Sequence, residues 1–353
     1  MKTAAIICEF NPLHNGHKKI INFAKTFADK VICIMSGNFV QRGTVAVANK
    51  YLRAEHAIRA GADLVVELPT GFALSSAENF AYGGVKIASL LNADYLVFGS
   101  ECGDLEKLKA CVTKLQDVDV NAEIRKQLAK GASYPKALAL ATETDVLDCP
   151  NNVLAVEYLR ALANTTSKIT PVTLLRENNY NGSPQKFASS SALRAEPNLR
   201  DKYTYDFVAK DIDDEIEKKY CDFATKFLAT SSKEYLEGIA GVTEGLHNRI
   251  FNADKTCGYE KMMAEIKTKR YTRAKLQRII ANCVLGITKD VEKRIKTETP
   301  LVKVLAVKST ETTLLSNQNI STDNFFDEIT SKADRLYATF DGKTPPIKLV
   351  KIL

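Results

Sequence analysis

Short apolar runs alternate with amphipathic segments along roughly the first half of the chain. The apolar runs cover residues 4–7, 30–35, 63–69, 94–98 and 169–175, and each has the length of a buried strand. Segments with helical spacing of apolar positions lie between them, at residues 17–24, 50–60, 75–91 and 151–163. Strands that alternate with helices in this way predict an α/β fold with a doubly wound parallel sheet.

The pattern becomes mainly helical in two places. We expect residues 104–146 to be helical with breaks at Gly131 and Pro135, Gly83-Gly84 to interrupt the helix at 75–91, and an asparagine to cap the helix at 151. Beyond residue 203, helices are predicted at 211–220, 233–240, 244–252, 259–269 and 272–285, followed by short strands at 302–307 and 346–353 that pack back on the body. The pattern therefore predicts two domains, residues 1–200 with the sheet and residues 201–353, mainly helical.

The composition indicates a soluble protein with enough apolar residues for a sizeable core. Of the 353 residues, 45% are apolar and 26% are charged. No apolar run approaches the roughly 20 residues of a membrane span, and the N-terminus lacks the pattern of a signal peptide. The eight cysteines are scattered without a Cys-x-x-Cys pair, which indicates reduced thiols. We therefore expect a cytoplasmic protein without membrane contact, and no feature requires a partner protein.

The stretch between the first strand and the first helix is the strongest candidate for chemistry. Residues 8–17 read Cys-Glu-Phe-Asn-Pro-Leu-His-Asn-Gly-His, and Asn11-Pro12 marks a turn. Free backbone N–H groups and the positive end of the helix dipole favour an anion at such a place. Two imidazoles three residues apart can donate hydrogen bonds to phosphate oxygens, so the stretch predicts an anion site.

The same two histidines have simpler interpretations. His-x-x-His can be half of a metal site, or one histidine can cap the helix. A zinc site needs three or four ligands, and the two remaining histidines, His56 and His247, stand outside any His/Cys cluster. We therefore predict no metal held by the protein alone.

Two further polar stretches occur where ligands commonly bind. Residues 36–43 follow the second strand, and polar loops at the carboxyl ends of strands bind ligands in open α/β sheets; an ordinary surface loop has the same composition. Residues 189–194, Ser-Ser-Ser-Ala-Leu-Arg, stand at a probable helix start. Their hydroxyls and Arg194 could bind an anion, although serine-rich helix starts are common caps.

Positive charge gathers in the second half of the chain. Residues 261–310 contain 13 Lys or Arg and 4 Asp or Glu, an excess of nine, whereas the whole chain carries +7. The densest part is residues 267–278, which include Tyr271. Basic side chains with an interleaved aromatic suit a nucleic-acid backbone and one stacked base, and a solvated helix face gives the same pattern. The candidate RNA contacts are Lys269, Arg270, Arg273, Lys275 and Arg278.

These motifs resemble those of a known family. His14-Asn15-Gly16-His17 resembles the HxGH signature of the nucleotidylyltransferase superfamily, and residues 189–194 resemble its ISSTxxR motif, with Ser191 in place of threonine. The stretches 11–17, 35–43, 67–69, 98–101 and 269–272 occur in the order found in the bacterial tRNA(Met) cytidine acetate ligases. The resemblance to that family extends from residue 6 to about residue 285.

The resemblance implies a HIGH-type nucleotidylyltransferase fold and an ATP-dependent ligase. Such an enzyme would form acetyl-adenylate from acetate and ATP, with Mg²⁺ on the phosphates, and transfer the acetyl group to N4 of the wobble cytidine of elongator tRNA(Met). His14, His17 and Arg194 would be catalytic. The implied ATP-binding residues are Ile7, Cys8, Glu9, Phe10, Asn11, Pro12, Leu13, His14, Asn15, Gly16, His17, Lys18, Lys19, Ile20, Gly99, Asn151, Arg176, Ser189 and Ser190.

Two other functions stay open at this point. One is an adenylyltransferase for a small metabolite or a carboxylate–amine ligase of the same superfamily, for which the basic second half has no evident use. The other is a non-catalytic protein that binds RNA or senses nucleotides, against which the two histidines and the arginines argue.

Overall fold

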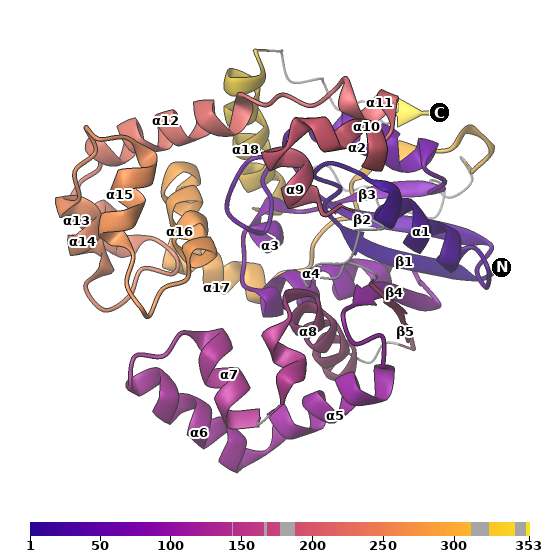
Figure 1. Ribbon diagram of the computed structural model, residues 1–353, viewed down its shortest axis with the longest axis horizontal. Helices are drawn as coiled ribbons and strands as arrows, with labels where there is room; N and C mark the ends of the chain where they lie inside the picture. Colours follow the sequence, from indigo (N-terminus) through magenta and orange to yellow (C-terminus); the bar gives the residue numbers. More distant parts are fainter. Residues whose placement is uncertain (143, 166–167, 177–187, 312–324, 343–350) are drawn as a thin grey trace.

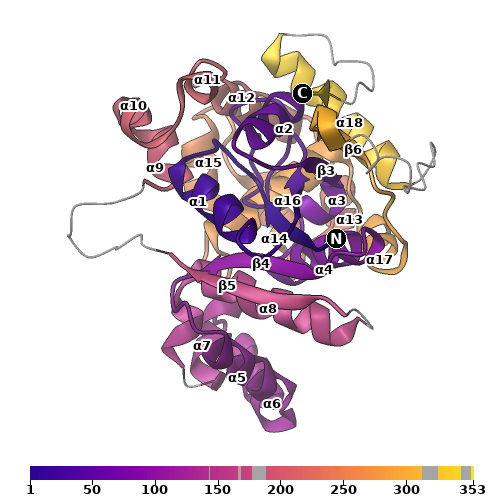
Figure 2. The same cartoon turned by 90° about the vertical axis from the view of Figure 1, so that its right-hand side faces the viewer.

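A central β-sheet organises the computed structural model, which describes the chain except residues 143, 166–167, 177–187, 312–324 and 343–350. Within the described residues the sheet has seven strands in the order β5-β4-β1-β2-β3-β6-β7. Helices cover both of its faces, as Figures 1 and 2 show.

Five parallel strands form the part of the sheet that the sequence predicts. They are β1 (Thr3–Cys8), β2 (Lys30–Ser36), β3 (Leu64–Leu68), β4 (Tyr95–Ser100) and β5 (Thr170–Leu175). Strand β1 pairs with β2 on one side and with β4 on the other. The chain thus changes its direction of travel across the sheet between β1 and β4, the place where doubly wound sheets bind ligands. The predicted α/β fold is confirmed.

Alternate residues of the strands enter two separate cores. Ala4 and Ile6 of β1 pack with helices α1 (Asn15–Ala24) and α2 (Lys50–Arg59). Ala5 faces the opposite core, which also receives α3 (Thr70–Ala73) and α4 (Ala77–Leu90). Burial on both faces explains why the strands are continuous apolar runs rather than alternating ones.

The glycine pair in α4 does not interrupt the helix, contrary to our prediction. A Cβ on Gly83 would lie 2.3 Å from the ring of Phe72, and one on Gly84 would lie 2.4 Å from Cδ1 of Ile7. The glycines therefore permit close packing of α4 on α3 and on the sheet, which sequence periodicity alone does not reveal.

A helical excursion separates β4 from β5. It contains α5 (Leu105–Gln116), α6 (Val118–Ala129), α7 (Tyr134–Thr142) and the short helix η1 (Asp145–Asp148), and it leads into α8 (Pro150–Asn164). The predicted asparagine cap of α8 is wrong, because the capping position is Cys149 and its side chain makes no capping hydrogen bond. The carboxylate of Glu101 accepts hydrogen bonds from the backbone N–H groups of Asn151 and Asn152 instead.

The chain then crosses to a second group of helices. After α9 (Ser190–Ala195), η2 (Pro197–Leu199), α10 (Arg200–Tyr203) and α11 (Asp206–Ala209) come α12 (Ile216–Ala229), α13 (Lys233–Gly238), α14 (Leu246–Asn252), α15 (Tyr259–Ile266), α16 (Arg273–Leu285) and α17 (Lys289–Thr297). We call α12–α16 the helical arm.

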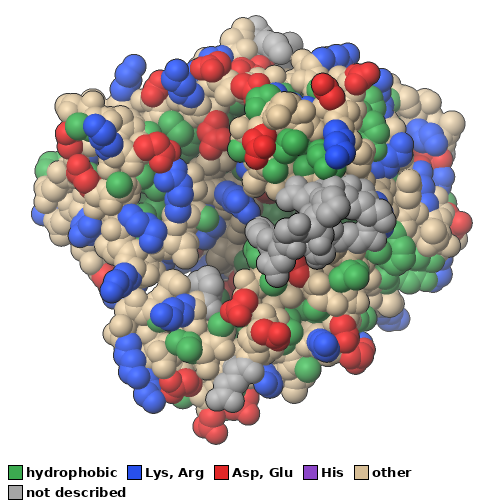
Figure 3. Space-filling view, in the orientation of Figure 1, with side chains coloured by type: hydrophobic (Ala, Val, Ile, Leu, Met, Phe, Trp, Pro, Cys, Tyr) green, Lys and Arg blue, Asp and Glu red, His purple; other side chains and the backbone are tan. Residues whose placement is uncertain are grey.

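Helix α12 begins five residues later than predicted. The segment before it packs on the loop after β2, where the N–H of Asp213 donates a hydrogen bond to the carbonyl of Val47. Figure 3 shows a hollow between the arm and α5–α7, bordered by Lys and Arg side chains.

The last part of the chain returns to the sheet. Strand β6 (Val304–Val307) pairs antiparallel with β3, and β7 (Lys351–Ile352) pairs with β6. Helix α18 (Phe325–Asp341) brings Asp334 to within 2.5 Å of Nζ of Lys50, whose ammonium is also 2.7 Å from Glu67. Segments within 201–353 thus complete the layer built by residues 1–200, while the boundary at residue 200 stays a prediction.

Some predictions fall partly outside the described residues. Residues 177–186, whose polar sequence with Asn-Gly and Ser-Pro predicts a loop, lie there entirely. Of the predicted strand at 346–353 the structure describes only β7 and the C-terminal residue. Among the helices that the structure does describe, none is long and apolar enough to cross a membrane.

Candidate active site at the strand ends

A cavity of about 1140 Å³ opens at the carboxyl ends of the parallel strands. Cys8 at the end of β1, Gln41 after β2, Gly99 in β4 and Leu175 at the end of β5 all line it. Helices α4, α8 and α16 supply further walls. Pockets for one small ligand commonly measure roughly 300–1,000 Å³, so this cavity has room for more than one substrate.

The two motif histidines line this cavity at the start of α1. His14 caps the helix: its Nδ1 accepts a hydrogen bond of 3.0 Å from the N–H of Gly16. Nδ1 of His17 accepts one of 3.2 Å from the N–H of His14, and the two rings stack with centroids 3.7 Å apart. A nitrogen that accepts a backbone N–H carries no proton, so each neutral ring carries its proton on Nε2. The capping interpretation and the phosphate interpretation are therefore both compatible with this geometry.

Burial keeps these imidazoles neutral. It lowers the pKa of His14 to about 3, with a smaller contribution from the positive charge of Arg176. Burial also holds the pKa of His17 well below its usual value, assisted by His14 and Arg176. Two neutral Nε2–H donors beside an arginine form a surface that favours negatively charged oxygens.

Strands β4 and β5 contribute the next wall. A Cβ on Gly99 would lie 3.0 Å from Cγ of Arg176, so the glycine gives the arginine side chain room to cross the end of β4. Nearby, Asn151 donates from Nδ2 to Glu101 at 2.5 Å. The pair joins the end of β4 to the start of α8, and both residues line the cavity.

The serine-rich segment packs against the turn before α1. Ser189 uses its hydroxyl to accept the N–H of Ala192, and Ser190 donates to the carbonyl of Pro12 at 3.0 Å. Arg194 donates to the carbonyl of Asn11 and lies 3.4 Å from Oγ of Ser191. The first two hydroxyls thus stabilise the protein itself, while the Arg194 guanidinium reaches the cavity wall.

Arg53 supports the site from below and is missing from the sequence-based candidates. Its side chain is fully buried in α2. It donates to the carbonyls of Ala48 (2.8 Å), Glu9 (2.6 Å) and Ser36 (3.1 Å), and also to that of Gly37. The guanidinium therefore holds the ends of β1 and β2 together. Its place within an ordinary amphipathic helix carried no signal of this role.

The predicted RNA contacts divide between the cavity and the outer surface. Arg270, Lys275 and Arg278 line the cavity, whereas Lys269 and Arg273 are exposed outside it. Arg270 forms an ion pair with Glu244 and donates to the carbonyl of Leu128 at 3.1 Å, so it bridges the helical arm and α6. Only part of the basic stretch is therefore a solvated face.

The other predicted positions also divide. Of the β1–α1 stretch, Ile7, Cys8, Glu9, Phe10, Asn11, His14, Gly16, His17, Lys19 and Ile20 line the cavity, as do Gly99, Asn151, Arg176, Ser189 and Ser190. Pro12, Leu13, Asn15 and Lys18 are not among the lining residues. Sequence reasoning missed Leu74, Ser75, Phe80 and Glu157, which also line it. They reach the cavity only through the packing of α3, α4 and α8, for which the sequence contains no motif.

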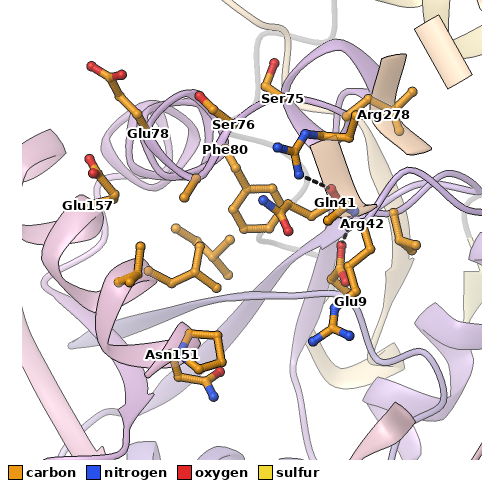
Figure 4. A pocket seen from close by; sticks show the side chains of 18 of the residues that line it. Glu9, Gln41, Arg42, Ser75, Ser76, Glu78, Phe80, Asn151, Glu157 and Arg278 are labelled. Atoms are coloured by element: carbon orange, nitrogen blue, oxygen red, sulfur yellow. Dashed lines mark hydrogen bonds between the residues drawn. The ribbon is translucent and has the colours of Figure 1, made fainter. Parts of the chain in front are cut away.

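The cavity wall has few groups suited to a metal ion. Among the described residues, no three His, Cys, Asp or Glu side chains gather as a metal site. Glu9 offers one carboxylate at the end of β1; its Oε1 accepts the N–H of Gln41 at 2.7 Å (Figure 4). One or two carboxylates plus substrate phosphates are the usual ligands of Mg²⁺, so the residues fit an ion that arrives on a nucleotide.

A large cavity at the switch point of a doubly wound sheet, with neutral imidazoles and arginines in its wall, is the arrangement of the nucleotidyl transferase class. A family model described as HIGH Nucleotidyl Transferase matches residues 1–339. The chain therefore belongs to the HIGH nucleotidyl transferase family and, within it, to the family of the tRNA(Met) cytidine acetate ligases, to which the following relatives attach it.

The relatives cover nearly the whole chain. The tRNA(Met) cytidine acetate ligase of Caldicellulosiruptor saccharolyticus is 36% identical over 88% of this chain and 83% of its own length. That of Staphylococcus carnosus is 35% identical over 98% and 96%. The crystal structure of Thermotoga maritima TmcAL (apo, form I) superposes with a TM-score of 0.85 at 26% identity, covering 96% of this chain and 95% of that one. A second Thermotoga structure, bound with alpha-thio ATP, has a TM-score of 0.82.

Proposed function

We propose that this enzyme activates acetate with ATP as acetyl-adenylate and transfers the acetyl group to N4 of the wobble cytidine of elongator tRNA(Met). The observation that carries the proposal is the pair of neutral Nε2–H donors of His14 and His17 beside Arg176 in a cavity with room for two substrates. The names of the relatives supply the acetate and the tRNA, and the Thermotoga structure with alpha-thio ATP supplies the nucleotide.

The first step needs no nucleophile from the protein. An acetate oxygen attacks the α-phosphorus of ATP, and the bond from that phosphorus to the pyrophosphate oxygen breaks with its electron pair. Such reactions are catalysed mainly by positioning and by neutralising charge. In the proposal, His14 and His17 donate to phosphate oxygens, and Arg176 and Arg194 stabilise the nucleotide and the departing pyrophosphate. Gly99 and Asn151 complete the ATP pocket. Mg²⁺ would be bound by the phosphates, and Glu9 could supply one carboxylate ligand.

The second step explains why acetate must be activated. The exocyclic amine of cytidine is a weak nucleophile, so it needs an activated acyl donor, and the base must leave its stack to reach the cavity. Residues 1–200 would carry out the adenylation and the helical part would bind the RNA. The exposed Lys269 and Arg273 and the bridging Arg270 are the proposed backbone contacts, and a cytoplasmic location would give access to tRNA.

The direct test is pyrophosphate release from ATP and acetate, with and without elongator tRNA(Met), followed by mass analysis of the tRNA. Acetate-dependent release and a gain of one acetyl group on cytidine are expected. His17→Ala should reduce release about 10²- to 10³-fold, because a donor aimed at the transition state is lost. Release without any change to the tRNA would contradict the proposed acceptor, and unchanged turnover by His17→Ala would contradict the site.

Removal of exposed charge on the arm tests the RNA half separately. Lys269→Gln with Arg273→Gln should weaken tRNA binding and reduce its salt dependence, because phosphate contacts release counterions. Pyrophosphate release from ATP and acetate alone should stay within about twofold. Lys218→Gln, an exposed charge on α12, is the matched control. Loss of both activities in the arm variant would contradict the division of labour.

A further inference from the structure

The cavity has two sides, and the proposed ATP residues account for only one of them. His14, His17, Gly99, Asn151 and Arg176 lie on the side of β1, β4 and β5. On the other side, beyond β2, the wall is made of Gln41, Leu74, Ser75, Phe80 and Arg278. This second side has room for a substrate that reacts with the phosphates of ATP.

Arg278 is the cation of this second side that contacts Gln41. It belongs to α16, which approaches the loop after β2 so closely that a Cβ on Gly43 would lie 2.2 Å from the backbone nitrogen of Arg278. This docking brings Nη1 of Arg278 to within 3.2 Å of the carbonyl of Gln41, as Figure 4 shows. Within the described part of the chain, Arg278 has this one hydrogen bond and no ion pair with a carboxylate.

The guanidinium is suited to receive an anion from a ligand. It has five N–H donors, and burial lowers the pKa of Arg278 to about 10. Removing a cation from water costs free energy unless an anion compensates it. Among the described residues no carboxylate forms an ion pair with this desolvated arginine, and this favours an anionic ligand at the cavity wall.

Two apolar side chains, Leu74 and Phe80, belong to the same side of the wall. Leu74 and Phe80 are each only 3% exposed and line the cavity near Ser75. In Figure 4 the Phe80 ring lies beside Gln41, with Arg278 and Ser75 near the same edge of the cavity. A ligand with one carboxylate and a short alkyl group matches these walls better than a large polar one.

We propose that Arg278, Gln41, Leu74 and Phe80 form the subsite for the small carboxylate substrate, with the carboxylate on the Arg278 guanidinium and the alkyl group against Leu74 and Phe80. This inference rests on the proposed function. One carboxylate oxygen is held by Arg278 while the other attacks the α-phosphorus; the new O–P bond forms as the bond to pyrophosphate breaks, and no proton is transferred. Arg278 is thereby separated from the RNA contacts with which the sequence grouped it.

The experiment is pyrophosphate release at varied acetate and varied ATP. Arg278→Gln should raise KM for acetate about 10- to 100-fold, the range expected for a lost charge-assisted hydrogen bond, with KM for ATP changed less than about twofold. Arg278→Lys should recover part of the loss. Lys293→Gln, which removes an exposed charge from α17, is the matched control and should leave both constants unchanged.

A second variant tests the apolar wall without depending on how much protein is folded. Leu74→Ala should raise the ratio of kcat/KM for butyrate to that for acetate, and a ratio does not depend on the active fraction. The subsite would be overturned if Leu74→Ala left the butyrate-to-acetate ratio unchanged and Arg278→Gln left the KM for acetate unchanged. A rise in the KM for tRNA alone would assign Arg278 to the RNA. If the wild-type protein released pyrophosphate at the same rate with and without acetate, the proposed function itself would be contradicted.

Discussion

His14 uses its two ring nitrogens for different purposes. Nδ1 caps α1 by accepting the N–H of Gly16, and this bond leaves the proton of the neutral ring on Nε2. His17 repeats the arrangement with the N–H of His14. A backbone hydrogen bond to Nδ1 thus determines the tautomer of each neutral ring and leaves its Nε2–H able to donate to a ligand.

The neutral histidines should make the stability of the protein depend on pH. The pKa of each ring in the folded state lies below its usual value of 6.5, so below that pH the unfolded chain binds more protons. Stability is therefore complete above about pH 6.5 and falls as the pH decreases toward 3, by about 1.4 kcal/mol per pH unit for each histidine. Urea unfolding of wild type and of His14→Gln/His17→Gln between pH 7.5 and 5 measures this.

The double variant should have the shallower slope in that interval. Asn15→Ala, in the same turn, changes no ionisable group and should keep the wild-type slope even if its overall stability differs. Equal slopes in wild type and the histidine variant would contradict the neutral state assigned to the rings.

Arg53 should be one of the most sensitive positions in the protein. Arg53→Ala removes a buried guanidinium that donates to four backbone carbonyls, and buried acceptors without donors are costly. We expect a loss of roughly 3–5 kcal/mol in the free energy of unfolding. Arg53→Lys should recover only part, because an ammonium cannot reach four acceptors in a fixed plane. Arg59→Ala on the same helix is the control and should cost far less, because Arg59 is exposed and lies over the ring of Phe207.

At the scale of elements, close packing depends on glycine in α4 and in the loop after β2. Helix α4 approaches Ile7 and Phe72 through Gly84 and Gly83, and α16 approaches the loop after β2 through Gly43. Helix propensity would favour alanine in α4 by about 1 kcal/mol. The tertiary contact outweighs this preference, because no side chain fits between the elements.

Alanine substitutions should separate the effect of helix propensity on stability from the effect of close packing. Gly84→Ala should destabilise the protein by roughly 1–3 kcal/mol, since the new methyl group would overlap Ile7. Gly238→Ala in α13, where nothing lies within 4 Å of the added Cβ, should stabilise it by about 0.5–1 kcal/mol. Thermal unfolding of the two variants is the measurement, and shifts of the same sign would contradict the packing explanation.

At the scale of the whole molecule, one buried ammonium joins distant parts of the chain. Lys50 of α2 is fully buried between Glu67 at the end of β3 and Asp334 of α18. Lys303 adds a second cation 3.4 Å from Glu67. This cluster attaches α18 to the layer that carries the cavity, and through Asn38 it reaches the loop after β2.

Removing the ammonium should cost more than removing an ion pair. Lys50→Met leaves two buried carboxylates without their main counter-charge, and we expect a loss of about 3–5 kcal/mol. Lys50→Met with Glu67→Gln removes one of those charges and should recover a measurable part. Urea unfolding of both single variants and the double variant gives the coupling energy. A double variant no more stable than Lys50→Met would contradict the role of uncompensated charge.

The sequence by itself determined the parallel sheet, the histidine motif between β1 and α1, and the family. These features are local. The strand, the tight turn and the helix that begins near Gly16-His17 are formed by consecutive residues, and the period of the apolar positions indicates which faces are buried. The serine cluster and the basic stretch were also visible, although their composition alone left ordinary caps and solvated faces as alternatives.

Tertiary structure alone decided which of these residues meet. In the sequence, Arg53 and Lys50 are polar positions of an amphipathic helix, whereas the structure buries both side chains in the core. Arg278 lines the cavity rather than the outer surface, because α16 packs against Gly43. The return of β6 and α18 to the sheet likewise joins segments more than 200 residues apart. Such contacts depend on how several elements pack together, and no short stretch of sequence contains that information.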